Sequence, residues 1–327
     1  MSDNYIIETK NLTKIYGNII AVNNLNLKIK EGEIFGLLGP NGAGKSTTIS
    51  MLCTLLKPSK GTAKVNGYDI QKEPISVRKS IGIVFQEVTL DTLLTGRENL
   101  EVHALLYGME KSVRESRINE LLKLMNLTKR ADDIVKTYSG GMKRRLEVAR
   151  GLLHHPKILF LDEPTLGLDP QTRAHTWKYI REMAQKEKTT IVMTTHYMDE
   201  ADMMCDRVGI IDKGKIIAID TPQNLKKMLG TAVLNLKFKV IPDEKTILEF
   251  VGTRKYSIHD HIIRITIENV ETDIVDILKK TPEIQTMEVR IPTLNDVFLH
   301  LTGRDLREDA PSNESWIETM LRYSTQR

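Results

Sequence analysis

The chain contains 327 residues, more than the roughly 100–200 of a typical single domain, so we expect two domains or one large domain with a smaller one. Hydrophobic residues make up 40% and charged residues 28%, as in ordinary globular proteins, and the longest apolar runs are strand-sized, which excludes a membrane-spanning helix by pattern. The net charge of +4 is small and dispersed, and it permits a nucleic-acid or membrane-surface partner without indicating one.

The two cysteines and the first residues indicate a compartment. Cys53 and Cys205 lie in apolar, helix-like contexts, so two buried thiols in a reducing environment are expected rather than a disulfide. Residues 1–5 show no basic start followed by an apolar stretch, so we predict no secretory signal. A cytoplasmic location is therefore expected.

The N-terminal part of the chain predicts short strands followed by a strand–loop–helix unit. Strands are predicted at residues 6–8 and 25–29. Residues 34–38 form a continuous apolar run, which is typical of a strand buried on both faces. This run stops at Gly39, where a glycine-rich loop and a helix follow.

The middle of the chain predicts helices and then alternating strands and helices. Apolar residues recur at helix spacing over about 97–155. Strands are predicted at residues 158–161, 191–194 and 208–211, with a helix at 172–185 joining the first two. Such alternation predicts an α/β fold with a mostly parallel sheet covered by helices.

A break near Gly230 ends a first domain at residues 5–230. Beyond it we predict strand, helix, strand, helix, strand and helix at residues 233–241, 244–251, 262–267, 271–280, 285–291 and 294–301. This pattern predicts a small C-terminal α+β domain at 231–303. The tail at 304–327 is polar but carries one apolar helical face, and we predict a short docked helix there.

One segment matches the phosphate-loop pattern G-x-x-x-x-G-K-[ST]. Its nucleotide-binding residues are predicted to be Gly39, Pro40, Asn41, Gly42, Ala43, Gly44, Lys45, Ser46 and Thr47. The glycines let successive N–H groups point at a phosphate chain, and the following helix adds its positive N-terminal end. Lys45 should reach the β- and γ-phosphates, and the Ser46 hydroxyl should ligate Mg²⁺.

A second apolar strand ends in two carboxylates, Asp162 and Glu163. Alone, an apolar strand followed by Asp-Glu is common, but downstream of a phosphate loop this is where a magnesium-directed group belongs. We predict that Asp162 holds Mg²⁺ through water and that Glu163 polarises the attacking water.

A Ser-Gly-Gly segment lies between these two motifs and precedes a basic helix. By itself, Ser139-Gly140-Gly141 is explained by a plain N-cap on a helix whose basic face is solvated. The order phosphate loop, Ser-Gly-Gly, Asp-Glu resembles the ATP-binding-cassette (ABC) family, whose signature has the form Leu-Ser-Gly-Gly-Gln. Tyr138 and Met142 depart from that signature, whereas the Ser-Gly-Gly core is intact.

The resemblance covers about residues 5–225. It implies a P-loop NTPase fold with a mixed, mainly parallel core sheet, an antiparallel β subdomain and a helical subdomain at about 87–155. It also implies four further site residues: Tyr16 stacking on adenine, Gln86 contacting the metal and the attacking water, Asp169 in a loop that crosses to a partner subunit, and His196 as a switch near the γ-phosphate. The implied cofactors are ATP and Mg²⁺, with Ser46, Gln86 and Asp162 directed at the metal.

One phosphate loop per chain implies, by the same resemblance, a dimer that sandwiches ATP. Ser139, Gly140, Gly141 and Asp169 of one subunit would then face ATP held by the other, in a homodimer or a heterodimer. Residues 90–100 and 295–303 resemble the daunorubicin-resistance group of exporter ATPases, which pair with a separate ABC-2-type membrane permease. Residues 86–107 would contact that subunit.

The resemblance therefore implies a peripheral ATPase on the cytoplasmic face of the cell membrane, exporting a drug, lipid or polysaccharide, with no nucleic-acid partner. Two other functions stay open. A soluble cassette ATPase acting on ribosomes or nucleic acid would usually carry two cassettes or a long coiled-coil insertion, and the chain has neither. A regulatory nucleotide-binding module would not need the intact set of Lys45, Asp162, Glu163 and His196.

Overall fold

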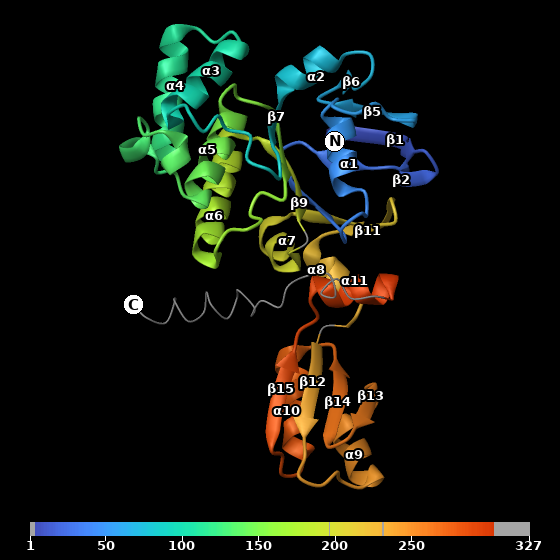
Figure 1. The fold of residues 1–327 in the computed structure, drawn as a ribbon. Helices are drawn as coiled ribbons and strands as arrows, with labels where there is room; N and C mark the ends of the chain where they lie inside the picture. The colour runs from blue at the N-terminus through green and yellow to red at the C-terminus, as the bar shows by residue number, and fades with distance from the viewer. Residues whose placement is uncertain (1–3, 196, 231, 304–327) are drawn as a thin grey trace. The chain divides into compact units, whose positions relative to one another are not determined.

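The computed structural model describes residues 4–195, 197–230 and 232–303, so His196 and the predicted docked helix in 304–327 lie outside the described residues. The chain forms two compact units that divide between Ile219 and Asp220 (Figure 1). The sequence instead places the break near Gly230. The difference arises from helix α8 (Pro222–Lys227), which packs against α11 (Leu294–Thr302) inside the second unit.

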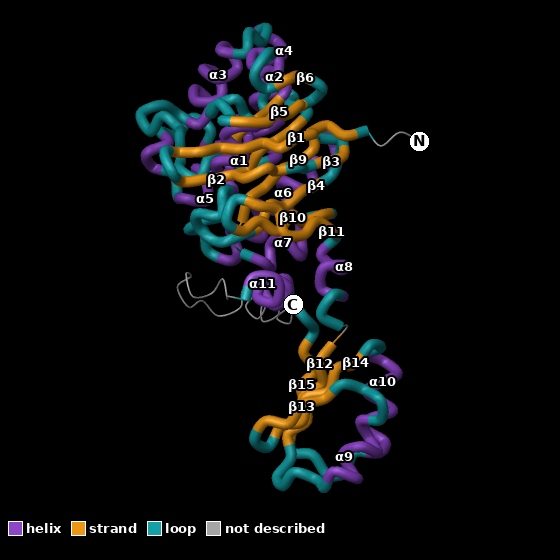
Figure 2. The backbone as a smooth tube through the Cα atoms, turned by 90° about the vertical axis from the view of Figure 1, so that its right-hand side faces the viewer, coloured by secondary structure: helices purple, strands orange, loops and turns teal. Residues whose placement is uncertain are grey.

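The first unit begins with an antiparallel sheet. Its strands are β1 (Tyr5–Tyr16), β2 (Ile19–Leu25), β3 (Lys28–Lys30), β5 (Lys60–Val65) and β6 (Tyr68–Asp69). Four of them follow the order β2-β1-β5-β6, with β3 paired to β1, and Figure 2 shows β1, β2 and β5 side by side. Strands β5 and β6 were not predicted, because their Lys- and Gly-containing segment lacks a clear apolar alternation.

A second sheet forms the core of this unit. Its strands are β4 (Ile34–Leu38), β7 (Ile81–Val84), β8 (Ile158–Asp162), β9 (Thr190–Thr195), β10 (Arg207–Asp212) and β11 (Lys215–Asp220), in the order β11-β10-β4-β9-β8-β7. The pairs from β10 through β7 are parallel, which confirms the mainly parallel sheet. Lys213 and Gly214 both have positive φ (47° and 75°) and turn β10 into β11, as in a two-residue hairpin.

Helices complete the first unit. They are α1 (Lys45–Leu52), α2 (Pro74–Ser80), α3 (Gly96–Leu106), α4 (Lys111–Leu124), α5 (Gly140–Leu152), α6 (Pro170–Glu187) and α7 (Met198–Met204), with the 3₁₀ turns η1 (Thr128–Arg130) and η2 (Val135–Thr137). Helix α1 contacts strands of both sheets, whereas α3 to α5 form the helical region between β7 and β8 (Figure 1). The carboxyl ends of the parallel strands therefore share one edge with the start of α1.

The second unit contains the element order β-α-β-β-α-β. After α8 come β12 (Ala232–Lys237), α9 (Glu244–Val251), β13 (Tyr256–His259), β14 (Ile262–Ile267), α10 (Val270–Lys280), β15 (Thr286–Arg290) and α11. The antiparallel sheet has the order β13-β14-β12-β15, a ferredoxin-like arrangement. Alternate residues of β12 and β14 are buried, which sets the register, whereas all four residues of β13 are exposed and gave no sequence signal.

Within the described parts of the chain, no helix combines the length and the apolar character that a bilayer span requires. Both cysteines are buried and form no disulfide, as expected from their apolar surroundings.

Candidate nucleotide site

The phosphate loop connects β4 to α1 through residues 39–44, and steric contacts fix its two outer glycines. A Cβ on Gly39 would lie 2.2 Å from the carbonyl oxygen of Ile211, and a Cβ on Gly44 would lie 2.4 Å from that of Ala21. Gly44 also has φ +103°, which side-chain-bearing residues rarely adopt. The turn and its close approach to β2 and β10 therefore require glycine at both positions.

Lys45, the first residue of α1, crosses beneath this loop. Its ammonium donates to the carbonyl oxygens of Gly39 (2.9 Å) and Pro40 (3.1 Å) and lies 3.7 Å from Glu163 Oε1. Burial lowers the pKa of Lys45, and the nearby Glu163 and Asp162 carboxylates oppose that effect. The buried cation is thus held at the loop by two neutral acceptors and a carboxylate, where an anionic phosphate chain would add charge balance.

Asp162 ends β8 and joins the phosphate-loop helix to β9. Its Oδ1 accepts hydrogen bonds from the Ser46 hydroxyl (3.1 Å) and from the Thr194 hydroxyl (2.5 Å). Ser46 and Asp162 are separated by 116 residues in sequence, so the parallel sheet brings them together. Hydroxyl and carboxylate oxygens are hard ligands of the kind that Mg²⁺ takes together with substrate phosphates, so this pair fits the predicted ion.

Glu163 directly follows Asp162 in an unusual backbone conformation. Its φ is +47°, and its N–H donates to both the carbonyl (3.2 Å) and the hydroxyl (3.0 Å) of Thr194. Left-handed backbone on a glutamate is uncommon and is found where surrounding structure over-determines it. The turn sends the two successive carboxylates to different partners, Asp162 to Ser46 and Glu163 to Lys45.

Arg144 of α5 connects three segments of the site. It is buried and donates to the carbonyl oxygens of Phe85 (2.5 Å), Gln86 (2.9 Å) and Glu163 (3.3 Å). It also forms an ion pair with the buried Glu147, at 3.0 Å. The reading of this helix as a solvated basic face is therefore wrong for Arg144. Its i,i+3 spacing to Glu147 is the only sequence signal that could have suggested burial.

Gln86 lies just beyond β7, at the same sheet edge. Its side chain is exposed, while its backbone is held by Arg144. The structure thus places Gln86 beside the carboxylate strand β8, which pairs with β7. Its contact with a metal or water stays a prediction.

The Ser-Gly-Gly segment and Asp169 cap two helices. Ser139 is the N-cap of α5 and accepts from Met142 N (3.3 Å), whereas Asp169 is the N-cap of α6 and accepts from Thr172 N (3.0 Å). The Thr172 hydrogen bonds lower the pKa of Asp169. A Cβ on Gly141 would lie 2.3 Å from Thr172 Cγ2, so the two helix N-termini are neighbours, and a Cβ on Gly140 would meet nothing.

Tyr138, which replaces the signature leucine, is a packing residue in this chain. It is buried, and its hydroxyl donates to the Arg130 carbonyl at 2.5 Å. A Cβ on Gly96 would lie 2.3 Å from that hydroxyl, so the ring end packs between the start of α3 and η1. The departure from the signature is therefore accommodated inside the helical region.

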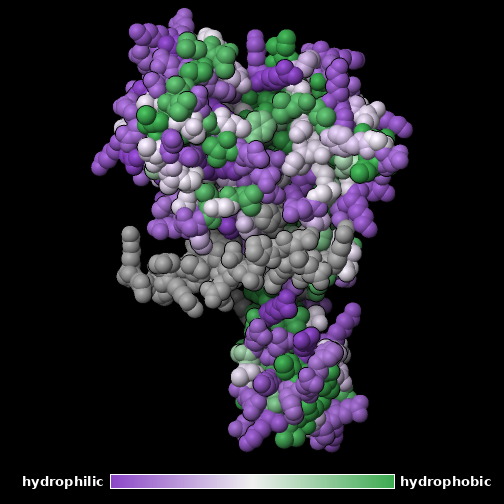
Figure 3. All heavy atoms as spheres, viewed as in Figure 1, coloured by the Kyte–Doolittle hydropathy of each residue, from purple (hydrophilic) through white to green (hydrophobic). Residues whose placement is uncertain are grey.

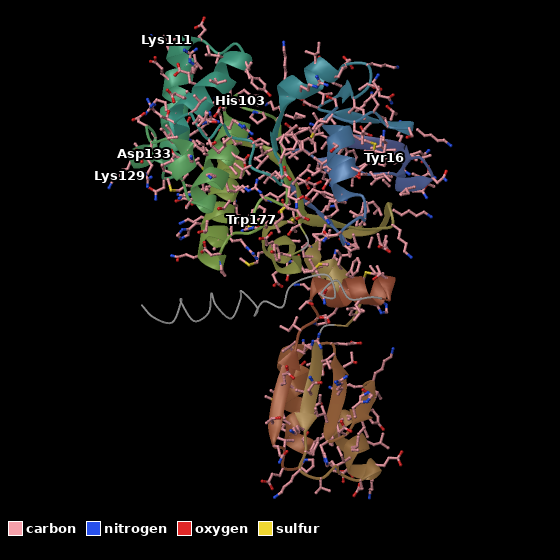
Figure 4. The ribbon with its side chains drawn as sticks, in the orientation of Figure 1. Tyr16, His103, Lys111, Lys129, Asp133 and Trp177 are labelled. Carbon is pink, nitrogen blue, oxygen red and sulfur yellow. The ribbon has the colours of Figure 1, made fainter. Side chains whose placement is uncertain are left out.

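Tyr16 lies at the end of β1 (Figure 4) and is 47% exposed, with the Lys14 ammonium 5.1 Å from its ring centroid. It pairs with Ile19 of β2, the strand whose Ala21 touches the phosphate loop at Gly44. An exposed ring on the strand pair next to the loop is available for stacking. His196 lies outside the described residues, and its role stays a prediction.

Two family descriptions match the chain. The ABC transporter family matches residues 22–166, and a family described as ATP-binding protein DrrA1-3-like, C-terminal domain, matches residues 221–302. The second match coincides closely with the second unit of the structure.

Curated proteins and solved structures give the same relationship. The linearmycin resistance ATP-binding protein LnrL of Bacillus subtilis is 38% identical over 93% of this chain and 100% of its own length. The daunorubicin/doxorubicin resistance ATP-binding protein DrrA of Streptomyces peucetius is 46% identical over 71% of this chain and 70% of its own. The dimeric structure of the ATP-binding cassette MJ0796 bound to ADP and Pi is 31% identical, with a TM-score of 0.61 over 66% of this chain and 98% of that one.

Proposed function

The chain belongs to the family of ABC transporter ATP-binding proteins, and from that membership we propose that it powers a separate ABC-2-type membrane permease that exports a drug, lipid or polysaccharide. Proteins of this family are ATPases, and this chain is one of them. The export direction is supported by relatives named for resistance to linearmycin and to daunorubicin.

The observation that carries the proposal is the joining of Lys45, Ser46, Asp162 and Glu163 at one sheet edge. Lys45 supplies a fixed positive charge at the phosphate loop, so we propose that it binds the β- and γ-phosphates and stabilises charge that develops there. Glu163, held by Thr194 and 3.7 Å from Lys45, would orient the attacking water and accept its proton.

The remaining phosphate-loop residues would bind ATP through their backbone N–H groups. Ser46 and Asp162 would hold Mg²⁺, which when bound neutralises phosphate charge. Thr194 keeps the Asp162 carboxylate oriented toward Ser46. Tyr16 would stack on the adenine, and Gln86 and His196 would complete the metal and γ-phosphate contacts.

We further propose that the site is completed by a second ATP-binding subunit. Ser139 and Gly140 lie at the N-terminus of α5, which attracts anions, and Asp169 caps the neighbouring N-terminus of α6. In a dimer they would face the nucleotide of the other subunit. The test is light scattering of Glu163→Gln with and without ATP and Mg²⁺: a doubled mass with ATP is expected, and an unchanged monomer mass would contradict a homodimer.

The permease is proposed to contact an apolar surface on the helical region. Four exposed side chains contribute to it: Leu93, Val102, Leu105 and Leu106, which are 76%, 48%, 55% and 79% exposed. Figure 3 shows hydrophobic side chains gathered over α3. A pocket of about 540 Å³ adjoins this surface and is lined by residues of α2 and by Leu106 and Tyr107. Exposed apolar patches of this kind mark interaction sites, and this one would place the chain at the cytoplasmic face of the membrane.

The experiment is co-expression with the membrane protein encoded beside this chain, followed by co-purification in detergent and an ATPase assay. We expect the pair to co-purify and turnover to rise with an exported compound. Leu105→Asp should abolish co-purification, whereas Val113→Asp, at a comparably exposed position on α4 (51%), should not. Equal retention of both variants would contradict the proposed surface.

A further inference from the structure

Glu200 of α7 is a fully buried carboxylate that no proposed step uses. Its side chain has 0% exposure, and burial raises its pKa, while hydrogen bonds from Thr165 and others act in the opposite direction. Burying a carboxylate is costly unless several donors satisfy it. The identity of those donors therefore indicates what the residue is for.

Two of the donors are threonine hydroxyls: one lies in the loop that follows β8, and the other is on the last residue of β9. Glu200 Oε1 accepts from Thr165 Oγ1 at 2.5 Å, and Oε2 accepts from Thr195 Oγ1 at 3.0 Å. Both threonines are 1% exposed. The Arg173 guanidinium of α6 adds an ion pair at 3.4 Å.

The first hydroxyl belongs to the loop that follows the proposed catalytic glutamate. Thr165 lies two residues after Glu163, and the N–H of Leu166 donates back to the Glu163 carbonyl at 3.2 Å. The Thr165 carbonyl accepts from Leu168 N at 3.1 Å, one residue before Asp169. The bond to Glu200 thus fixes a short loop between Glu163 and Asp169.

The second hydroxyl belongs to the end of β9. Thr195 follows Thr194, which binds both Asp162 and the Glu163 backbone. The Thr195 hydroxyl also accepts from Tyr197 N at 2.9 Å, and the Arg173 guanidinium lies 4.1 Å from the Tyr197 ring centroid. Glu200 and Arg173 therefore hold the chain on either side of position 196.

The Glu200 carboxylate is shielded from solvent, because its residue is 0% exposed. A pocket of about 300 Å³ between α6 and α7 adjoins Glu200 and combines the apolar Ala174, Trp177 (labelled in Figure 4), Met203 and Met204 with Lys178, Arg181, Glu182 and Gln185. Hydrogen bonds between groups as fully buried as Glu200, Thr165 and Thr195 are stronger than hydrogen bonds in water. The Thr165 and Thr195 bonds are thus suited to keeping two loops in one fixed arrangement.

We propose that Glu200 is a positioning residue for ATP hydrolysis, which through the Thr165 and Thr195 hydroxyls locks the loop after Glu163 to the end of β9. The proposal rests on the ATPase activity assigned above. Glu200 itself touches no reacting atom. Its effect is on where Glu163 sits, and a displacement of about 1 Å in such a group can lower turnover by about 10²-fold.

The test compares threonine variants of the full-length chain in steady-state ATPase assays, with nucleotide affinity and melting temperature measured alongside. Thr165→Val keeps the shape and removes the hydroxyl, and we expect kcat to fall about 10- to 100-fold with KM and nucleotide affinity within about twofold of wild type. Thr165→Ser keeps the hydroxyl and should restore kcat.

A matched control comes from the opposite end of β9. Thr189 is also buried, at 2% exposure, and its hydroxyl donates to the Pro156 carbonyl at 3.3 Å, so Thr189→Val makes the same side-chain change and removes a buried hydroxyl bond outside the site. Its kcat should equal that of wild type. Thr195→Val should resemble Thr165→Val, and the double variant should be no slower than the worse single one, because both bonds act through Glu200.

Wild-type kcat in Thr165→Val, or an equal loss in Thr189→Val, would overturn the positioning role while leaving the ATPase assignment intact. Absence of turnover in the wild-type chain would overturn that assignment and the positioning role with it. A loss of melting temperature and of kcat in Thr165→Val that Thr165→Ser rescues in neither measurement would also overturn the proposal, because the hydroxyl bond to Glu200 would then not be what turnover depends on.

Discussion

The two units bury polar groups in very different ways. The first unit encloses charged side chains such as Lys45, Arg144, Glu163 and Glu200, each with less than a tenth of its surface exposed. In the described part of the second unit, the buried polar or charged residue is Asn295. The second unit's core cluster is built from aliphatic residues together with Phe238 and Phe250.

This difference suggests that the buried residues of the second unit serve stability, whereas several of those in the first unit serve the chemistry of the site. An apolar core stabilises a fold without needing exact partners, whereas buried charges cost free energy and tolerate no missing partner. In the first unit, Lys45, Arg144 and Glu163 gather at the carboxyl edge of the parallel sheet. There Lys45 lies beside Glu163, Asp162 accepts from Ser46, and Arg144 donates to the Glu163 carbonyl. We infer that the first unit keeps these buried charges, despite their cost in folding free energy, because catalysis needs them. Among the residues that the structure describes, the second unit's core lacks such charges.

The largest expected effect is in the first unit. Glu163→Gln removes the carboxylate proposed to orient water and accept its proton, so we expect kcat to fall about 10²–10⁴-fold. ATP binding should persist, because Lys45 and the loop remain. Phosphate release measures kcat, and a fluorescent ATP analogue measures nucleotide binding. An unimpaired kcat would contradict the catalytic role given to the first unit's buried charges.

Phe250→Ala tests the second unit. Phe250 is 1% exposed and its ring centroid lies 6.1 Å from that of Phe238, so the truncation should lower the free energy of unfolding of this unit by about 3–5 kcal/mol. Hydrogen exchange resolved by peptide would report it. Turnover by the first unit should persist below the transition.

The control for Phe250→Ala is Leu248→Ala on the same helix, where the side chain is 49% exposed and little stability should be lost. If Phe250→Ala abolished nucleotide binding at a temperature where the first unit stays protected from exchange, the two units could not be treated as separate in chemistry and stability.

The smallest effects come from a matched pair of helix caps. Asp169 caps α6 and Asp243 caps α9, each accepting from the backbone N–H of a threonine three residues later, at 3.0 and 2.8 Å. Ala at either position should lower the melting temperature of its own unit slightly. Only Asp169→Ala should also lower turnover, because only that cap lies at the proposed subunit interface.

These caps also predict a pH dependence. Hydrogen bonds from the capped threonines lower the pKa of both Asp169 and Asp243 below the ordinary 3.8. Because a carboxylate with a lowered folded-state pKa stabilises only while ionised, the contribution is present above about pH 4 and is lost as the pH falls through the lowered value. The Ala variants should therefore converge with wild type in thermal stability at low pH, and a gap that stays constant would contradict the capping role.

Local pattern was sufficient for much of the fold. Two elements have the predicted bounds: the strand Ile34–Leu38 and the helix Glu244–Val251. The strand is buried on both faces and reads as a continuous apolar run, whereas the helix is buried on one face and shows the helical period. The exposed strand Tyr256–His259 carries no such signal, because it is held by pairing with β14 rather than by burial.

The site shows the same division. Lys45, Ser46, Asp162 and Glu163 belong to contiguous motifs and could be read from sequence. Arg144 and Glu200 could not, because their roles depend on partners such as the Phe85 and Glu163 carbonyls and the Thr165 hydroxyl, 19 to 59 residues away, that only the fold brings near. Tyr16, Gln86 and His196 were assigned by resemblance, and their contacts stay predictions.

The most direct measurement of the central claim is phosphate release from ATP and Mg²⁺ by the full-length chain, compared with Lys45→Ala. Lys45 is the buried cation that the phosphate loop and Glu163 surround, so we predict steady turnover by the wild-type chain and none above background in the variant. Equal turnover by both proteins would contradict the account, because hydrolysis would then take place somewhere other than this site.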